Sequence, residues 1–237
     1  MNNLIVVRHG QSLWNKSKRF TGWADIDLTE HGKAEAELAG KLIKELNIEF
    51  DNYFTSVQKR AINTLQIILS ILNKKNTIVE KAWELNERHY GALTGLNKDE
   101  IMEKHGTKQV QIWRRSFDIP PPPMDSNHPY NKNVYTGIPK DKVPKSESLK
   151  NTFERVVPYY EKKIEPLIFS KKNILIAAHG NSLRALCKKI FSISNEEIIN
   201  FEIPTGNPLL ISFDNNLKVK NYKYLDVKRS KKILFNI

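Results

Sequence analysis

One short motif occurs twice in the sequence, and its residue types suit phosphoryl chemistry. The first copy is His9-Gly10-Gln11-Ser12-Leu13 and the second is His179-Gly180-Asn181-Ser182-Leu183. A neutral imidazole is nucleophilic near neutral pH and can take up a phosphoryl group. The glycine allows a close backbone approach, and the start of a helix favours an anion. The motif therefore predicts an anion-binding site that contains His9 and His179.

The positions of the two histidines indicate that they meet. Each follows a short apolar run, at residues 4–7 and 174–178, of the kind that forms a strand buried on both faces of a parallel sheet. Ligands of open α/β sheets bind at the carboxyl ends of such strands. A single copy would more often be a histidine that merely ends a strand. Two copies, one preceded by Arg8, favour a shared active site instead.

Further charged residues follow other expected strands. Arg60 stands in the first turn of a helix after the second strand, and Glu87 and Arg88 stand in an irregular stretch after the third. A phosphoryl group carries a charge of about −1.5 to −2 and is bound best by planar guanidinium groups. Taken singly, Arg60 or Arg88 could equally form a surface salt bridge. Their shared place at strand ends favours the site, and Arg114 and Arg115 could reach a second anionic group.

Alternating strand and helix patterns must position these residues. Short apolar runs predict strands at residues 4–7, 53–56, 77–80, 173–178, 209–213 and 217–224. Helical spacing predicts helices at residues 31–46, 57–72, 97–106, 108–115, 149–164 and 182–190, with a kink at Pro158. The last two strands read as an antiparallel hairpin. We therefore expect a three-layer α/β sandwich with a mostly parallel central sheet and an antiparallel edge strand.

The length and composition describe a compact protein. Residues 1–237 are expected to form a single domain, with an excursion at about residues 97–147 that contains an irregular proline-rich stretch. One cysteine, Cys187, excludes an internal disulfide and fits a reducing compartment. No apolar run approaches the roughly 20 residues of a membrane-spanning helix, and the start lacks the features of a secretory signal. We expect a cytoplasmic protein with no membrane partner.

A formal net charge of +12 raises the possibility of nucleic-acid binding. The basic residues come mostly in pairs, such as Lys74-Lys75 and Lys171-Lys172, and no run of five or six like charges forms an arm. Such pairs are typical of a solvated surface. We therefore expect a small anionic substrate and no nucleic-acid partner. A basic nucleic-acid-binding protein would need a continuous basic stripe, which a salt-dependent electrophoretic shift would detect.

The motifs are similar to those of a known family. They lie at residues 4–15, 20–23, 55–61, 85–91, 113–115 and 178–184. Together they closely resemble the 2,3-bisphosphoglycerate-dependent phosphoglycerate mutases of the histidine phosphatase superfamily, over about residues 4–224. The resemblance implies a metal-free, glycolytic interconversion of 3-phosphoglycerate and 2-phosphoglycerate. The reaction would pass through a phosphohistidine, primed by 2,3-bisphosphoglycerate, and a 2,3-bisphosphoglycerate intermediate. We also expect a homodimer.

The resemblance also implies roles for individual residues. His9 would be the phosphorylated nucleophile, Glu87 the proton donor and acceptor, and His179 the second histidine that stabilises the transferring group. The phosphoryl group would be bound by Arg8, Asn15, Arg60, Gly180 and Asn181. The rest of the substrate would be bound by Thr21, Gly22, Arg88, Tyr90, Lys98, Arg114 and Arg115.

Two features depart from the family pattern. Many relatives carry Glu where this chain has Gln11, and we expect the amide to replace it with little effect. After Leu225 the chain differs from the longer Ala- and Lys-rich tail that is common in relatives. Whether a tail covers the site in this chain is left open.

Two alternatives to the mutase interpretation follow from the same residues. A histidine phosphatase would hydrolyse a phosphorylated small metabolite with water, but it would not need the excursion that carries Lys98, Arg114 and Arg115. A metal site built from His9, Glu87, His89 and His179 is disfavoured, because the surrounding arginines would repel a divalent cation.

Overall fold

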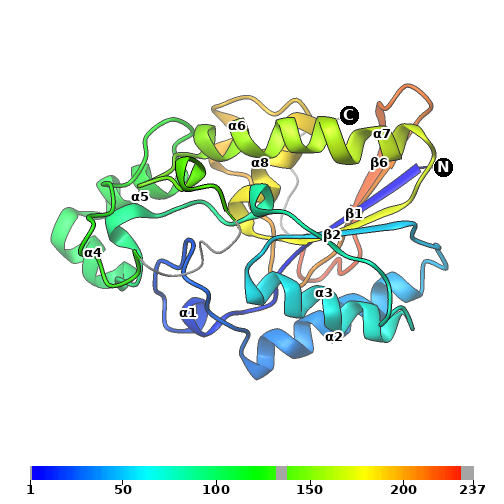
Figure 1. The fold of residues 1–237 in the computed structure, drawn as a ribbon, viewed down its shortest axis with the longest axis horizontal. Helices are drawn as coiled ribbons and strands as arrows, with labels where there is room; N and C mark the ends of the chain where they lie inside the picture. The colour runs from blue at the N-terminus through cyan, green and yellow to red at the C-terminus, as the bar shows by residue number, and fades with distance from the viewer. Residues whose placement is uncertain (1, 132–137, 231–237) are drawn as a thin grey trace.

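A six-stranded sheet forms the centre of the molecule (Figure 1). The computed structural model describes residues 2–131 and 138–230. The strands are β1 (Asn2–Arg8), β2 (Asn52–Thr55), β3 (Glu80–Lys81), β4 (Ile174–Ala178), β5 (Leu209–Phe213) and β6 (Val219–Tyr224). Their order across the sheet is β3-β2-β4-β1-β5-β6. Strands β1 to β4 are parallel, whereas β5 runs antiparallel to both β1 and β6, so the antiparallel part is the expected hairpin at one edge.

The register of β1 and β4 brings the two copies of the motif together. These strands are adjacent and parallel, and Arg8 is paired with Ala178 at their carboxyl ends. The backbone N–H of His9 then donates to the carbonyl oxygen of Ala178 at 2.9 Å. His9 and His179 therefore leave the sheet side by side, although 170 residues separate them in the sequence.

Helices cover both faces of the sheet, as predicted. Helices α2 (Glu30–Lys44) and α3 (Lys59–Ile71) pack on one face, while α6 (Leu149–Tyr159), α7 (Glu165–Phe169) and α8 (Gly180–Ile190) pack on the other (Figure 1). Alternate residues of β1 point to opposite layers: Leu4 and Val6 join one core, and Ile5 and Val7 join the other. All four are fully buried. The three-layer sandwich with a mostly parallel sheet is confirmed.

The excursion forms a helical lobe at the carboxyl ends of the central strands. It contains α4 (Lys98–His105) and α5 (Thr107–Arg115), which lie at the end of the molecule near α1 (Leu13–Lys16) in Figure 1. The side chain of Asn97 caps α4 by accepting from the N–H of Asp99 at 2.8 Å. Gly106 joins α4 to α5 with a φ of +80°, a conformation that favours glycine. The lobe packs around Phe20 and Val110, so α4 and α5 are held against the loop that follows β1.

Several predicted elements begin or end at other residues in the structure. The helix expected at 149–164 includes Pro158 without stopping, passes into a π-helical segment at Tyr160–Ile164 and continues as α7. Proline lacks the N–H that an α-helix needs, and a π segment changes the hydrogen-bond register. The helix expected from residue 57 begins at Lys59, because the N–H of Gln58 instead donates to the hydroxyl of Ser56. The strand expected at 77–80 is the two-residue β3, whose Glu80 and Lys81 are exposed at the sheet edge.

The remaining helical turns are short. They are 3₁₀ turns at Trp83–Leu85, Gly91–Leu93, Lys140–Lys142 and Glu197–Ile199. The proline-rich stretch is otherwise irregular where it is described, and it is tied back by the bond from the N–H of Met124 to the carbonyl of Lys145. Part of the excursion, residues 132–137, and the last part of the C-terminal tail, residues 231–237, lie outside the described residues.

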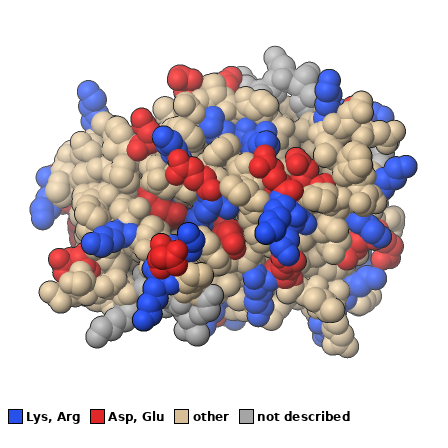
Figure 2. Space-filling model, turned by 45° about the horizontal axis from the view of Figure 1, so that its top comes forward, with Lys and Arg blue, Asp and Glu red and all other residues tan. Residues whose placement is uncertain are grey.

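Side chains of both charges are distributed over the surface of the protein. Lys and Arg side chains are interspersed with Asp and Glu over the face shown in Figure 2. None of the helices in the described ranges is long and apolar enough to cross a membrane.

Candidate active site

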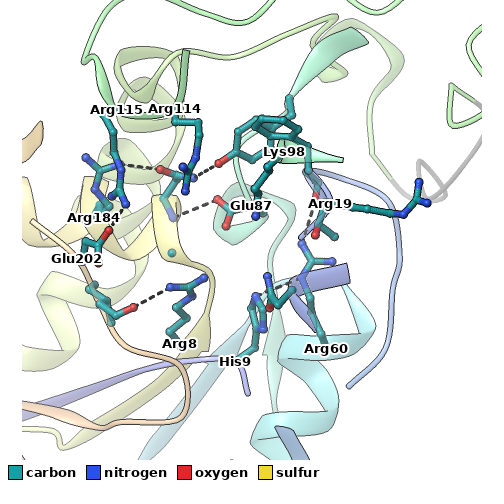
Figure 3. Close-up of a pocket in the computed structure, with 18 residues that line it drawn as sticks. Arg8, His9, Arg19, Arg60, Glu87, Lys98, Arg114, Arg115, Arg184 and Glu202 are labelled. Carbon is teal, nitrogen blue, oxygen red and sulfur yellow. Dashed lines mark hydrogen bonds and ion pairs between the residues drawn. The ribbon is translucent and has the colours of Figure 1, made fainter. Parts of the chain in front are cut away.

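A cavity of about 200 Å³ lies where β1 and β4 end (Figure 3). It is lined by Arg8, His9, Asn15, Arg19, Phe20, Thr21, Gly22, Arg60, Glu87, Tyr90, Lys98, Arg114, Arg115, Gly180, Asn181, Arg184, Glu202 and Ile203. Every site residue predicted from the sequence is in this lining except His179 and Arg88. Those two side chains are fully buried. The structure therefore brings together residues from the β1 loop, α3, the 83–93 turns, the helical lobe and α8.

The hydrogen bonds of His9 define its tautomer. Its Nδ1 lies 2.7 Å from the carbonyl oxygen of Gly10, which can only accept, so Nδ1 carries the proton. The Nε of Arg60 donates to His9 Nε2 at 3.3 Å, so Nε2 holds the lone pair. Burial, followed by the charges of Arg60 and Arg8, lowers the pKa of His9 well below 6.5. His9 is therefore neutral at pH 7, and the nitrogen beside Arg60 is the nucleophilic one.

Arg60 is fixed in place as a buried cation. Its two terminal nitrogens donate to the carbonyls of Ala24 at 2.9 Å and Gly22 at 2.8 Å. Gly22 presents that carbonyl from a backbone with a φ of +52°, where an added Cβ would lie 3.0 Å from the backbone nitrogen of Tyr90. Burial lowers the pKa of Arg60 to about 10, which leaves it charged at pH 7. The loop at residues 22–24 thus aims a permanent positive charge at His9.

His179 lies directly behind His9. The two ring centroids are 5.0 Å apart, and His179 Nε2 lies 2.7 Å from the hydroxyl oxygen of Ser56, the residue after β2. Its Nδ1 is buried and has no hydrogen-bond partner among the described residues. Burial, with Arg60 and His9, lowers the pKa of His179 well below 6.5. Ser56 was not predicted as a site residue, although its place at the end of a parallel strand was a usable signal.

Glu87 is held so that one carboxylate oxygen is occupied by the backbone. Its Oε1 accepts from the N–H groups of Arg88 at 2.8 Å and Asn181 at 3.1 Å. An added Cβ on Gly180 would lie 3.6 Å from Glu87 Oε2 and 3.4 Å from the guanidinium carbon of Arg8. The absence of a side chain at Gly180 therefore keeps open the space between Glu87 and Arg8.

A hydrogen-bonded row orients the amide of Asn181. Arg184 donates to Asn181 Oδ1 at 2.8 Å, and Asn181 Nδ2 donates to the Tyr90 hydroxyl at 3.3 Å. The guanidinium carbon of Arg88 lies 4.7 Å from the Tyr90 ring centroid, and Arg88 also donates to the carbonyl of Arg114. Burial raises the pKa of Tyr90, but Arg88 and Lys98 outweigh it and lower the pKa to about 8. Arg88 thus contacts the cavity lining through Tyr90 and the end of α5.

The cavity is strongly cationic. Its positive side chains are Arg8, Arg19, Arg60, Lys98, Arg114, Arg115 and Arg184, and its carboxylates are Glu87 and Glu202. Buried polar atoms without a hydrogen-bond partner in the described ranges include Arg8 Nε, Thr21 Oγ1 and His179 Nδ1. Buried polar groups are stable only when they are hydrogen-bonded, and charged donors bind anionic oxygens most strongly. The chemistry of the site therefore fits a small ligand with several negative charges.

The side chains fit a metal ion less well. Within residues 2–131 and 138–230, no group of three or more His, Cys, Asp and Glu side chains is arranged to hold one. His89 packs against Trp23, and its Nδ1 accepts from the N–H of Gly91 at 3.0 Å. These contacts hold the loop just after Glu87, so the structural place of His89 is one of support.

Some residues of the cavity wall were not predicted from the sequence. They are Arg19, Phe20, Arg184, Glu202 and Ile203. Arg184 follows Asn181 by three residues in α8, and this spacing puts both on one helix face, which was a usable signal. Arg19 donates to the carbonyl of Gly95 and points away from the other labelled side chains in Figure 3. Asn15, which was predicted, also completes the capping box of α1, because its Oδ1 accepts from the N–H of the N-cap residue Ser12 at 3.1 Å.

Comparisons with known proteins agree with this geometry. Residues 4–222 match the family model of the histidine phosphatase superfamily, branch 1. A 2,3-bisphosphoglycerate-dependent phosphoglycerate mutase of Pelagibacter ubique is 54% identical over 237 residues, covering 99% of each chain. An enzyme of the same name from Hyphomonas neptunium is 51% identical and covers 97% of each chain.

Solved structures share the fold at lower identity. The α-ribazole phosphatase of Shigella flexneri has a TM-score of 0.68 and 20% identity, covering 92% of this chain and 93% of its own. A mycobacterial glucosyl-3-phosphoglycerate phosphatase has a TM-score of 0.68 and 18% identity, covering 94% of this chain and 97% of its own. The family resemblance predicted from the sequence is confirmed, and the chain belongs to the histidine phosphatase superfamily, branch 1.

Proposed function

We propose that this enzyme interconverts 3-phosphoglycerate and 2-phosphoglycerate through a phosphorylated His9. The observation that carries the proposal is the neutral His9 Nε2, set beside Arg60 in a cavity lined mainly by cations. The relatives that are 54% and 51% identical over nearly the whole chain bear the name of this activity, which supports it.

The charges of the cavity fit 2,3-bisphosphoglycerate. With two phosphates and a carboxylate, this molecule carries a charge of roughly −4 to −5 near neutral pH. Arg8 and Arg60 would bind the phosphoryl end next to His9, with His179 Nδ1 and the backbone of Gly180. Lys98, Arg114 and Arg115 would bind the distal phosphate and the carboxylate. When bound, bisphosphoglycerate supplies the phosphoryl group that primes the enzyme.

His9 performs the transfer. In the primed enzyme the bond from His9 Nε2 to phosphorus breaks as the free hydroxyl of phosphoglycerate attacks, which gives bisphosphoglycerate. After this molecule has turned around, Nε2 attacks its other phosphorus, the bond from that phosphorus to the substrate oxygen breaks, and the isomerised phosphoglycerate is left. The positive charge that develops on the ring is stabilised by the bond from Nδ1–H to the carbonyl of Gly10. Arg8 and Arg60 stabilise the negative charge on the phosphoryl oxygens, because they are already oriented when the reaction begins.

Glu87 moves the proton. One of its oxygens, Oε1, is fixed by two backbone N–H groups, which leaves Oε2 on the side of Gly180 and Arg8. We assign Oε2 to give a proton to the leaving oxygen and to take one from the attacking hydroxyl. The same proposal gives Asn15 and Asn181 a role in binding the phosphoryl group. It gives Thr21, Gly22, Arg88 and Tyr90 a role in binding the rest of the substrate.

The organisation of the protein is also part of the proposal. We treat residues 1–237 as one domain in which the excursion at about 97–147 binds the distal end of the substrate. We also propose that the protein is a cytoplasmic homodimer. Its reaction needs no metal, and it has no nucleic-acid partner.

The competing activity is that of a phosphatase. Solved structures named as phosphatases resemble this chain, but at 18–20% identity they show the fold alone. The mutase is favoured by Arg114 and Arg115, which line the cavity from α5 and give it a second cationic end. Bisphosphoglycerate held at both ends can turn around and give its other phosphoryl group back to His9. Weak binding of phosphoglycerate would instead leave the phosphorylated His9 to hydrolysis by water.

A coupled assay tests the proposal. Conversion of 3-phosphoglycerate to 2-phosphoglycerate should require added 2,3-bisphosphoglycerate and should survive EDTA. Incubation with labelled bisphosphoglycerate should give His9 an acid-labile phosphoryl group, and His9→Ala should lose both label and turnover. Release of inorganic phosphate without isomerisation would establish the phosphatase instead.

The excursion can be tested by replacing Arg114 and Arg115 together with Ala. Loss of the distal cations should raise the Michaelis constant for phosphoglycerate and lower the ratio of mutase to phosphatase turnover. Lys104→Ala, on the exposed side of α4, is the matched control and should change neither. An unchanged ratio in the double variant would remove the excursion from the binding site.

A further inference from the structure

Glu202 is a carboxylate fixed in the wall of a cavity built for anions. It lies in the segment between the 3₁₀ turn at Glu197–Ile199 and β5, between Phe201 and Ile203, which are both buried in the core. Its carbonyl accepts from the Tyr224 hydroxyl at 3.3 Å, and the carbonyl of Ile203 accepts from Arg8 at 2.9 Å. The backbone at Glu202 is therefore anchored beside the cavity.

The carboxylate of Glu202 forms an ion pair with Arg115. The contact joins Glu202 Oε1 to a terminal nitrogen of Arg115, and the side chains are 30% and 26% exposed. Figure 3 shows the two side chains facing each other beside Arg184, across the cavity from His9. Arg115 is also a residue that our proposed function assigns to the distal anion of the substrate. The Arg115 guanidinium can therefore pair either with Glu202 or with the distal anion of the substrate.

The ion pair of Glu202 with Arg115 lies among other positively charged side chains. Burial, followed by Arg114, lowers the pKa of Arg115, and burial, followed by Arg88 and Arg115, lowers the pKa of Arg184 to about 9. These arginines therefore repel one another in the absence of a ligand. Glu202 is the one acidic side chain of the cavity lining, in the part of the chain that is described, besides the catalytic candidate Glu87. Its charge offsets part of this repulsion when no substrate is bound.

We propose that Glu202 is a specificity-determining residue, which competes with the distal anion of the ligand for Arg115 and so limits the affinity for ligands with two anionic ends. A bound distal anion must share Arg115 with a fixed carboxylate or displace it, and the like charges repel. The penalty grows with the charge at the distal end. Glu202 therefore weakens the binding of the bisphosphorylated species more than that of the monophosphorylated ones. It favours release of the bisphosphorylated species.

Calorimetric titration of the unphosphorylated enzyme tests this directly. The probes are inorganic phosphate, which has one anionic end, and phosphoglycolate, which has a phosphate and a carboxylate but no hydroxyl to be phosphorylated. Glu202→Gln should lower the dissociation constant of phosphoglycolate by about two- to fivefold, as expected for the removal of a partly exposed charge. The dissociation constant of inorganic phosphate should change less. The gain should shrink as potassium chloride is added, since salt screens exposed charges.

Two further variants isolate the mechanism. Glu196→Gln removes the same charge from an exposed position outside the cavity and should leave both dissociation constants unchanged. In an Arg115→Ala background, Glu202→Gln should no longer tighten phosphoglycolate, because the contested group is gone. A tightening that persists without Arg115, or that Glu196→Gln reproduces, would show a general charge effect and overturn the proposal. So would unchanged or weaker binding of phosphoglycolate by Glu202→Gln.

These results are separable from the proposed function on which the inference rests. Binding of the two probes needs no turnover. A chain that lacks mutase activity but shows the Glu202 effect would overturn the proposed function alone. A working mutase in which Glu202→Gln leaves phosphoglycolate binding unchanged would overturn only the role of Glu202.

Discussion

The Nε of Arg60 donates a hydrogen bond to Nε2 of His9 over 3.3 Å, and both side chains are almost completely buried. This contact has two consequences. Arg60 occupies the lone pair of His9 Nε2 until a phosphoryl group displaces it from that nitrogen, and the charge of Arg60 disfavours protonation of the ring. A nucleophile that is neutral over a wide pH range is the result.

Arg60→Gln should shift the acid limb of the pH–rate profile. Arg60 lowers the pKa of His9, so its removal raises that pKa. Because the neutral ring is the reactive form, kcat/KM should begin to fall at a higher pH than in the wild type. The loss of a preorganised cation should also lower kcat by about 100-fold or more. Lys59→Gln, on the exposed side of the same helix, is the control for net charge, and an acid limb that stays in place in Arg60→Gln would contradict this account of His9.

Gly180→Ala should separate activity from stability. The new Cβ would make ordinary contacts of 3.4–3.6 Å with Arg8 and Glu87, so the fold should tolerate it. It would, however, fill the space in which we place the phosphoryl group, so turnover should fall by at least tenfold. Gly106→Ala is the converse control, because its φ of +80° should cost about 1 kcal/mol or more of stability. A Gly180→Ala enzyme with wild-type turnover would place the phosphoryl group elsewhere.

Ser56→Ala should act through His179. The Ser56 hydroxyl lies 2.7 Å from His179 Nε2, and its loss frees the ring to turn. We expect kcat to fall by about tenfold while the Michaelis constant stays near the wild-type value, with a loss of stability of about 1 kcal/mol. Ser182→Ala is the matched comparison, because that hydroxyl contacts the backbone N–H of His179 and not its ring. Equal losses of kcat in the two variants would argue against an orienting role for Ser56.

The buried histidines should make the protein less stable in acid. Burial lowers the pKa of His9 and His179 well below 6.5 and that of His89 to about 4. In the unfolded chain these rings take up protons near pH 6.5, so the unfolded state binds more protons as the pH falls. The free energy of unfolding should therefore decrease below pH 6.5, by about 1.4 kcal/mol per pH unit for each ring.

Denaturant titrations at several pH values between 7.5 and 5 measure this slope. His89→Gln removes one titrating ring and should make the slope smaller, whereas His105→Gln, an exposed residue of α4, should leave it unchanged. A free energy of unfolding that does not vary over this range would show that the three rings are protonated in the folded protein.

Much of the fold and the pairing of the two histidines followed from the sequence. The buried strands at residues 4–7 and 174–178 are continuous apolar runs, and such runs are typical of strands that are buried on both faces of a parallel sheet. Parallel strands end at one edge, so the residues that follow them meet. The meeting of His9 and His179 could therefore be predicted without coordinates, as could the three layers and the hairpin.

Other features were decided only by the tertiary structure. The bond from Ser56 to His179 spans 123 residues, and the ion pair of Arg115 with Glu202 spans 87. Neither has a local pattern, because each depends on where two unrelated segments come together. The hydrogen bond at His9 Nε2 likewise comes from Arg60, which is aimed by the carbonyls of a distant loop. Sequence periodicity determines which residues are buried and where strands end, whereas the electrostatics of the site depend on distances between segments that only the packed chain fixes.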